Sequence, residues 1–159
     1  MIFNREVLAK TLKELPDVIE AYIRNIPAIV LDLKRNDETW TIREHIYHIA
    51  QVQDMLLSRI LTIQNEEHPV MVPYFPENET ERTAIYSSLD EALAKYKDIR
   101  KNQLSLIDQI TKAALNKDAV HGEYIQYNIP IIINHMIFHE YWHMYRIEQI
   151  WLTRDEYFL

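Results

Sequence analysis

Apolar side chains recur along this chain at the spacing of amphipathic helices. Four long segments carry them three or four positions apart, which is the period of one buried helical face. These segments are residues 4–23, 41–64, 88–110 and 129–152. Helices of this length become stable by burying their apolar faces against one another. The pattern therefore predicts an all-α protein built as a four-helix bundle.

Polar residues near the segment ends support the predicted helix boundaries. Thr39 or Thr41 can cap the second helix, and Glu44 lies three residues after Thr41, at the position expected in a capping box. Asn128 can cap the fourth helix, whose first turn tolerates the proline that follows. Pro16 lies inside the first segment and cannot donate a hydrogen bond to the preceding turn. We therefore expect Pro16 to kink or divide that helix.

The connections between the segments differ in length. Residues 65–78 contain three prolines and few periodic apolar positions, which predicts a long crossover loop. Such a loop allows the second and third helices to run parallel instead of forming a tight hairpin. Residues 80–86 can add a helical turn. Residues 111–127 include the single glycine, Gly122, and are expected to form a connector with a short extended piece at 123–127.

The composition narrows the class of protein. A chain of 159 residues is the size of one domain, here residues 1–159, and its lack of cysteine leaves histidine and carboxylates as metal ligands. The net charge of −7 repels phosphate, so nucleic acid is not an expected partner. Polar residues interrupt the apolar runs, which argues against a membrane span. The N-terminus lacks the basic and apolar regions of a secretion signal, so we expect a cytoplasmic protein.

Histidines interrupt the apolar face of the fourth predicted helix. His135, His139 and His143 follow at steps of four and therefore share one side of that helix. His135 and His143 are about 12 Å apart along the axis, too far to share one ion. Neighbouring pairs can share one, and His139 with His143 is the stronger pair. A complete site needs a further ligand, and the second predicted helix, which carries His45 and His48, is the obvious donor. His45 could be a second imidazole on the site, but a position at the surface or behind a metal ligand is favoured.

The remaining two histidines fall in predicted loops. His68 and His121 are expected to be solvated, because polar loop residues are generally exposed. We assign neither of them a role.

Two other interpretations of the histidine-rich helix remain open. The string His139-Glu-Tyr-Trp-His143 matches the zinc-peptidase pattern, with Glu140 as the general base. Such peptidases need a third ligand downstream, and no histidine follows His143, so this interpretation is less favoured. The histidines could instead form a purely structural ladder, hydrogen-bonded to nearby tyrosines and carboxylates. The candidate partners are Glu140, Tyr141, Tyr145 and Glu148.

Two segments of the chain together resemble the DinB/YfiT-like superfamily of metal-dependent four-helix-bundle proteins. The first is Trp40-Thr-Ile-Arg-Glu with His48 eight residues after the tryptophan, and the second is the histidine series from His135 to His143. The resemblance implies a bundle with a long crossover between helices 2 and 3. It also implies a metal site formed by His48, His139 and His143. The chain departs from the superfamily pattern at Gln51, where a carboxylate is common, and after His143.

The chemistry implied by this resemblance depends on an open metal site. Three imidazoles leave at least one coordination position for water or substrate. Imidazole suits zinc, nickel, copper and iron, and of these we favour zinc or nickel. The resemblance implies a hydrolase, or a transferase that uses a low-molecular-weight thiol, acting on a small molecule. Glu140 and Gln51 are candidates for orienting the nucleophile. The alternative is a metal-binding or ligand-binding bundle without catalysis, and in either case we expect a homodimer.

Overall fold

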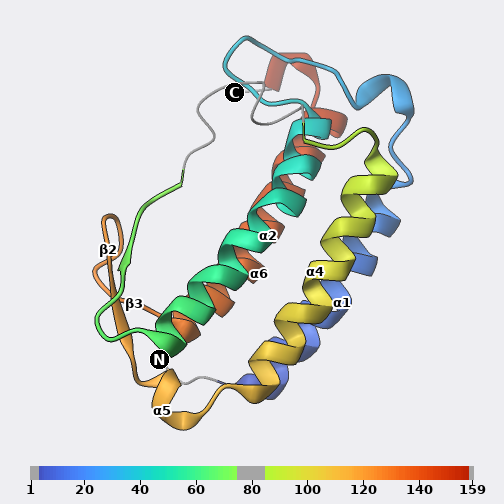
Figure 1. The fold of residues 1–159 in the computed structure, drawn as a ribbon. Helices are drawn as coiled ribbons and strands as arrows, with labels where there is room; N and C mark the ends of the chain where they lie inside the picture. The colour runs from blue at the N-terminus through green and yellow to red at the C-terminus, as the bar shows by residue number, and fades with distance from the viewer. Residues whose placement is uncertain (1–3, 75–84, 158–159) are drawn as a thin grey trace.

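The computed structural model describes residues 4–74 and 85–157 and confirms the predicted four-helix bundle. Its long helices are α1 (Arg5–Ile23), α2 (Ile42–Asn65), α4 (Leu89–Gln109) and α6 (Ile129–Leu152). Figure 1 shows α2 beside α6 and α4 beside α1, with α2 and α4 running in the same direction. The long connection between α2 and α4 makes this parallel arrangement possible. The helical turn predicted over 80–86 falls mostly outside the described residues.

The helix starts lie where their capping residues predict. The side chain of Thr41 accepts a hydrogen bond from the backbone N–H of Glu44 at 3.1 Å, and the Glu44 carboxylate accepts one from Thr41 at 2.6 Å. Asn4 and Asn128 cap α1 and α6 in the same way, through their side-chain oxygens. These caps fix the phase of each helix and therefore which side chains face the core.

The structure corrects the prediction that Pro16 divides the first helix. α1 is continuous from Arg5 to Ile23, with Pro16 buried inside it. The proline costs one intrahelical hydrogen bond, but the apolar face around it remains packed. The buried residues of this face are Leu12, Leu15, Ile19 and Ile23.

The core lies between the four helices and draws on all of them. Fully buried representatives are Leu12 on α1, Ile60 on α2, Ile107 on α4 and Ile133 on α6. Each buried side chain of this size stabilises the fold by about 1.5–3 kcal/mol relative to exposure. Because burial fixes the rotation of α2 and α6 about their axes, it also fixes where their histidines point.

Short elements complete the fold. They are the 3₁₀ helices η1 (Ala28–Val30) and η2 (Asp155–Tyr157), the helix α5 (Lys112–Leu115), and the strands β1 (Val70–Met71), β2 (Asp118–His121) and β3 (Tyr127–Asn128). In the small sheet, β2 pairs in parallel with β1 and antiparallel with β3. Figure 1 shows the strands beside the end of α2 and the start of α6.

The extended piece predicted at 123–127 is displaced in the structure. The strands instead occupy Asp118–His121 and Tyr127–Asn128, and residues 122–126 form the turn between them. The pairing of β1 with β2 joins residues about fifty positions apart, so local sequence pattern carries little information about it.

In the part of the chain that the structure describes, no helix has the length and apolar character needed to cross a membrane.

Candidate metal centre

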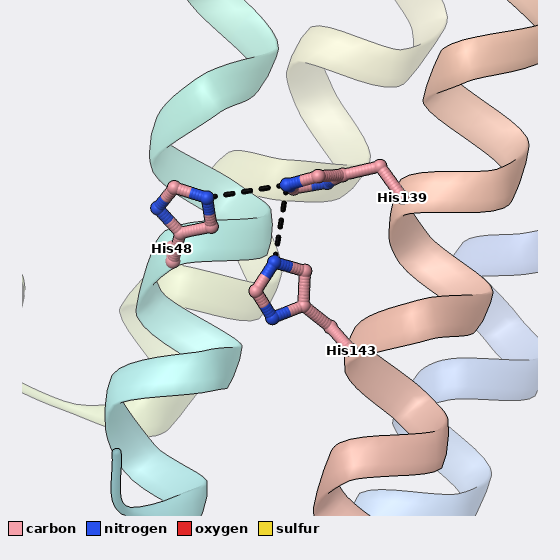
Figure 2. Close-up of side chains that lie close together, drawn as sticks. All are labelled: His48, His139 and His143. Carbon is pink, nitrogen blue, oxygen red and sulfur yellow. Dashed lines mark hydrogen bonds between the residues drawn. The ribbon is translucent and has the colours of Figure 1, made fainter. Parts of the chain in front are cut away.

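Three imidazoles from two antiparallel helices point at one another. Figure 2 shows His48 on α2 facing His139 and His143 on α6. The Nε2 atom of His139 lies 3.2 Å from Nε2 of His48 and 3.1 Å from Nε2 of His143. One ring nitrogen from each histidine lies within 4.8 Å of the others. The structure therefore brings together the three residues expected as ligands.

The arrangement of these nitrogens fits a single metal ion. Each neutral imidazole offers one lone pair and one N–H. Nε2 of His139 faces two other Nε2 atoms, so one hydrogen bond cannot satisfy both contacts. A zinc ion bound at 2.0–2.1 Å in tetrahedral geometry would hold its nitrogens about 3.3 Å apart, close to the two observed separations. A cation among the three rings would engage all three lone pairs.

Trp40 forms a wall beside two of the candidate ligands. Its ring centroid lies 5.1 Å from that of His48 and 5.9 Å from that of His143, with the second pair nearly stacked. Trp40 immediately precedes the Thr41 cap, so the start of α2 and this wall are positioned together. The aromatic contacts restrict the rotation of both imidazoles.

His45 lies behind the candidate metal ligands. It is 3 % exposed, and its Nδ1 lies 2.7 Å from Nδ1 of His143. With a cation on Nε2 of His143, Nδ1 of the same ring would carry the proton and would donate a hydrogen bond to Nδ1 of His45. Of the positions considered for His45, which were on the site, at the surface and behind a ligand, the structure supports the last.

Replacing His45 by alanine is expected to weaken zinc binding about 10–100-fold, as removal of a partner that orients a metal ligand commonly does. His45→Gln should restore part of the affinity, because its amide oxygen can accept the hydrogen bond from His143. Zinc titration against a competing chelator measures this effect. Equal zinc affinity in wild type and His45→Ala would show that the hydrogen bond does not support the site.

The buried imidazoles are held neutral. Burial lowers the pKa of His45 to about 3, and the nearby charge of Arg146 acts in the same direction. Burial also lowers the pKa of His139 to about 3, with neighbouring His48 adding to the effect. The pKa of His143 falls well below its usual range for the same main reason. Neutral imidazole is the form that binds metal.

The metal-free protein is expected to lose stability as the pH falls below about 6.5, because unfolding exposes these imidazoles to protonation. Above that pH each neutral imidazole makes its full contribution to the stability of the folded state. This contribution is lost as the pH falls toward about 3, at up to about 1.4 kcal/mol per pH unit. Urea unfolding across this range measures the slope, which His45→Gln should reduce and His68→Gln should not. If His45→Gln left the pH dependence of stability unchanged, burial of neutral His45 would not be a cause of that dependence.

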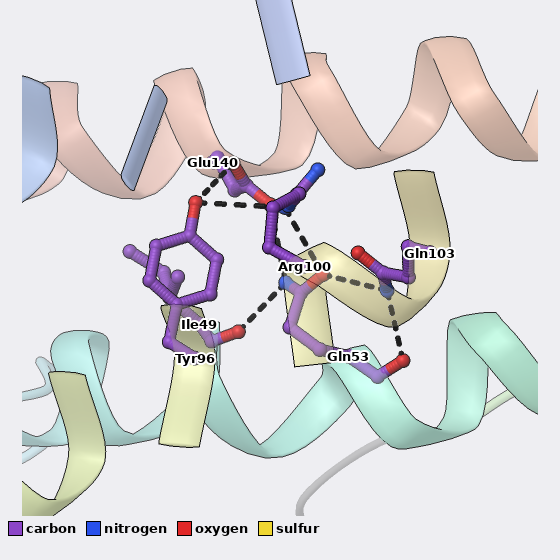
Figure 3. A network of polar contacts seen from close by, with 6 residues as sticks. All are labelled: Ile49, Gln53, Tyr96, Arg100, Gln103 and Glu140. Carbon is purple, nitrogen blue, oxygen red and sulfur yellow. Dashed lines mark hydrogen bonds and ion pairs between the residues drawn. The ribbon is translucent and has the colours of Figure 1, made fainter. Parts of the chain in front are cut away.

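The structure does not place Glu140 beside the three imidazoles. Its carboxylate is fully buried between helices and forms an ion pair with Arg100. It also accepts hydrogen bonds from the Tyr96 hydroxyl at 2.6 Å and from Gln53 at 3.1 Å, as Figure 3 shows. Burial raises the pKa of Glu140, while Arg100 and the hydrogen bonds oppose that shift. The carboxylate that a peptidase would use as general base is therefore committed to this network.

Gln51, the other candidate for orienting a nucleophile, lies at the side of the site. Its amide donates a hydrogen bond to the Tyr74 hydroxyl at 2.9 Å. The Tyr74 ring in turn stacks over His48, with centroids 6.4 Å apart. Gln51 therefore acts on the site through the position of Tyr74.

A cavity of about 170 Å³ adjoins the candidate metal centre and contains groups that the sequence did not reveal. His48 and His139 line one part of it, and Arg59 and Tyr127 line another. The expectation that His121 is solvated is wrong, because His121 is 8 % exposed on β2 and also lines this cavity. Its position depends on strand pairing, for which the sequence pattern gave no signal.

The other histidines also have defined places. The ring of His135 lies beside that of His139, with centroids 5.5 Å apart, and its Nδ1 lies 2.9 Å from the Tyr124 hydroxyl. His68 is exposed, as predicted. Tyr141 and Tyr145 are exposed and are not the partners of a buried histidine ladder.

Residues 11–153 match the model of the DinB superfamily. The match covers most of the chain, so the protein belongs to the DinB superfamily. It is similar in fold to a solved structure, that of YfiT from Bacillus subtilis, described as a probable metal-dependent hydrolase with an unusual four-helix bundle topology. That likeness has a TM-score of 0.79 at 18 % identity and covers 92 % of this chain and 85 % of the other. No curated protein matches the chain.

Proposed function

We propose that this protein is a metal-dependent enzyme in which His48, His139 and His143 bind one divalent ion, zinc or nickel, and a small molecule is the substrate. The observation that carries the proposal is the convergence of three ring nitrogens, from two buried histidines and the half-buried His139, beside a cavity. An ion held there would act as a Lewis acid and activate water or a low-molecular-weight thiol. The use of a low-molecular-weight thiol and the assembly into a homodimer remain predictions.

The residues around the ligands have separate tasks in this proposal. Trp40 closes one side of the site against the rings of His48 and His143. His45 accepts a hydrogen bond from the Nδ1–H of His143 and so fixes which nitrogen of His143 faces the ion. Tyr74 covers His48 at the cavity and is held by Gln51. The cavity gives a small substrate access to His139, which is less deeply buried than the other two ligands.

The description of YfiT as a probable metal-dependent hydrolase supports hydrolysis as the first reaction to test. A specific observation supports the alternative of a metal-binding bundle without catalysis. Glu140, which follows a ligand directly, is held by Arg100 and Tyr96 and is not available to accept a proton from a nucleophile.

Assays on metal-stripped and zinc-reconstituted protein separate these functions. We would measure hydrolysis of p-nitrophenyl acetate and transfer of cysteine to chlorodinitrobenzene, in wild type, His48→Ala and the matched surface control His68→Ala. An enzyme should show activity that depends on zinc, is lost in His48→Ala and is retained in His68→Ala. Zinc binding without either activity would favour the non-catalytic bundle for these substrates, and activity that survives metal removal would reject a metal-centred reaction.

A further inference from the structure

Among the described residues that line the cavity beside the candidate metal centre, Arg59 is the strongly basic one. Arg59 lies on α2, three turns after His48, and its guanidinium donates to the Tyr127 hydroxyl at 2.9 Å and to the backbone carbonyl of Val72. Neither of these oxygens carries a charge. The two contacts therefore hold the guanidinium in place without neutralising it.

The positive charge of Arg59 affects the pKa values of other groups in the cavity. Burial is the largest cause of the lowered pKa values of His121 and His135, and the positive charge of Arg59 is the second largest. It also opposes the rise in the pKa of Tyr127 that burial causes. Glu123 is exposed at the same cavity and acts in the opposite direction on both histidines, more weakly than Arg59 does. At both histidines the positive charge of Arg59 therefore outweighs the negative charge of Glu123, whereas at Tyr124 the effect of Glu123 on the pKa is the larger.

The cavity is small and its walls near Arg59 are aromatic. The ring of Tyr127 lies 4.4 Å from that of His121 and 5.3 Å from that of Tyr124, measured between centroids. A cavity of about 150 Å³ can take a molecule of the size of benzene, so a volume of about 170 Å³ suits a ligand with one ring or a short unsaturated chain. Planar rings in the wall favour a planar ligand.

We propose that this cavity binds the substrate as a small planar carboxylate, with Arg59 holding the carboxylate group and His48 and His139 lining the part where the reacting atom lies. The planar guanidinium matches a carboxylate in shape and charge, and its five N–H groups leave donors beyond the two that contact Tyr127 and Val72. The proposal rests on the metal centre proposed above for its chemistry. Recognition of the carboxylate depends on Arg59 and can be measured without metal.

Binding of benzoate and of its neutral analogue benzamide to metal-free protein tests this proposal. Metal-free protein is used because a carboxylate could otherwise bind the ion directly. We expect wild type to bind benzoate at least about tenfold more tightly than benzamide, the effect of one charge-assisted contact. Arg59→Met should bring the two affinities together while benzamide affinity stays unchanged, which shows that the cavity is intact. Ligand-observed NMR measures both.

Three control variants keep the interpretation specific. Arg154→Met removes the same charge from an exposed position outside the cavity and should leave the preference for benzoate unchanged. Tyr127→Phe keeps the charge of Arg59 but removes one of the two contacts that hold it, so it should reduce the preference without abolishing it. Arg59→Lys should retain part of the preference for benzoate over benzamide.

The proposal is overturned if wild type binds benzoate no more tightly than benzamide, if it binds no benzoate, or if the preference survives in Arg59→Met. Failure of the metal centre gives a different result. A wild type that takes up no zinc but prefers benzoate through Arg59 would reject the metal-dependent function and leave the carboxylate site in place.

Discussion

Replacing Arg100 by methionine is expected to lower the free energy of unfolding by about 3–5 kcal/mol, because it leaves the carboxylate of Glu140 buried without its ion-pair partner. Arg100 is 2 % exposed and Glu140 is fully buried, so water cannot take over the lost contact. The hydrogen bonds from Tyr96 and Gln53 remain but do not supply a compensating charge. Urea unfolding of the metal-free proteins measures the change.

Two further variants separate the buried charge from the loss of a side chain. The double variant Arg100→Met with Glu140→Met should recover much of the stability, since replacing both partners of a buried pair by apolar residues is often neutral or stabilising. Lys97→Met breaks the more exposed pairs with Asp17 and Glu20 and should cost less than about 1 kcal/mol. A loss in Arg100→Met no larger than that in Lys97→Met would contradict the role given to the buried pair.

Zinc is expected to stabilise the wild-type protein and to have little effect on His143→Ala. A ligand that binds only the folded state at 100 times its dissociation constant adds about 2.7 kcal/mol, which for a domain of this size raises the melting temperature by roughly 5–10 °C. His143→Ala removes one of the three nitrogens and leaves a pair, which binds zinc far more weakly. Thermal unfolding with and without zinc measures both shifts.

His68→Ala is the matched control for this experiment, because it removes an exposed imidazole away from the site. Its melting temperature should respond to zinc as the wild type does. A zinc response in His143→Ala as large as that of the wild type would mean that the ion binds elsewhere on the chain.

The bundle and its helix boundaries could be predicted because local signals and burial agree. Thr41 with Glu44 and Asn128 cap α2 and α6 as expected, and the apolar period identifies the buried faces. The pairing of His139 with His143 follows from helix geometry alone. The second helix could be expected to supply a further ligand because it carries His45 and His48. The choice of His48 came from the resemblance, since the spacing of residues on one helix does not determine which side chain lies opposite.

Features that depend on contacts distant in sequence were missed. His121 is buried because β2 pairs with β1 and β3, and Arg59 meets Tyr127 for the same reason. The placement of Glu140 has a simple physical cause. Successive residues are rotated by about 100° around a helix, so the residue after His139 faces α4 instead of the imidazoles. A matching string alone could not distinguish a general base from half of a buried ion pair.

The metal content of purified, untagged protein tests the central claim most directly. Wild type and His48→Ala would be prepared identically, loaded with zinc, dialysed and measured by elemental analysis. The three-histidine site predicts about one ion per chain in the wild type and almost none in His48→Ala, because two imidazoles from α6 alone do not retain the ion. Equal zinc content in the two proteins would contradict the claim that α2 and α6 together form the metal site.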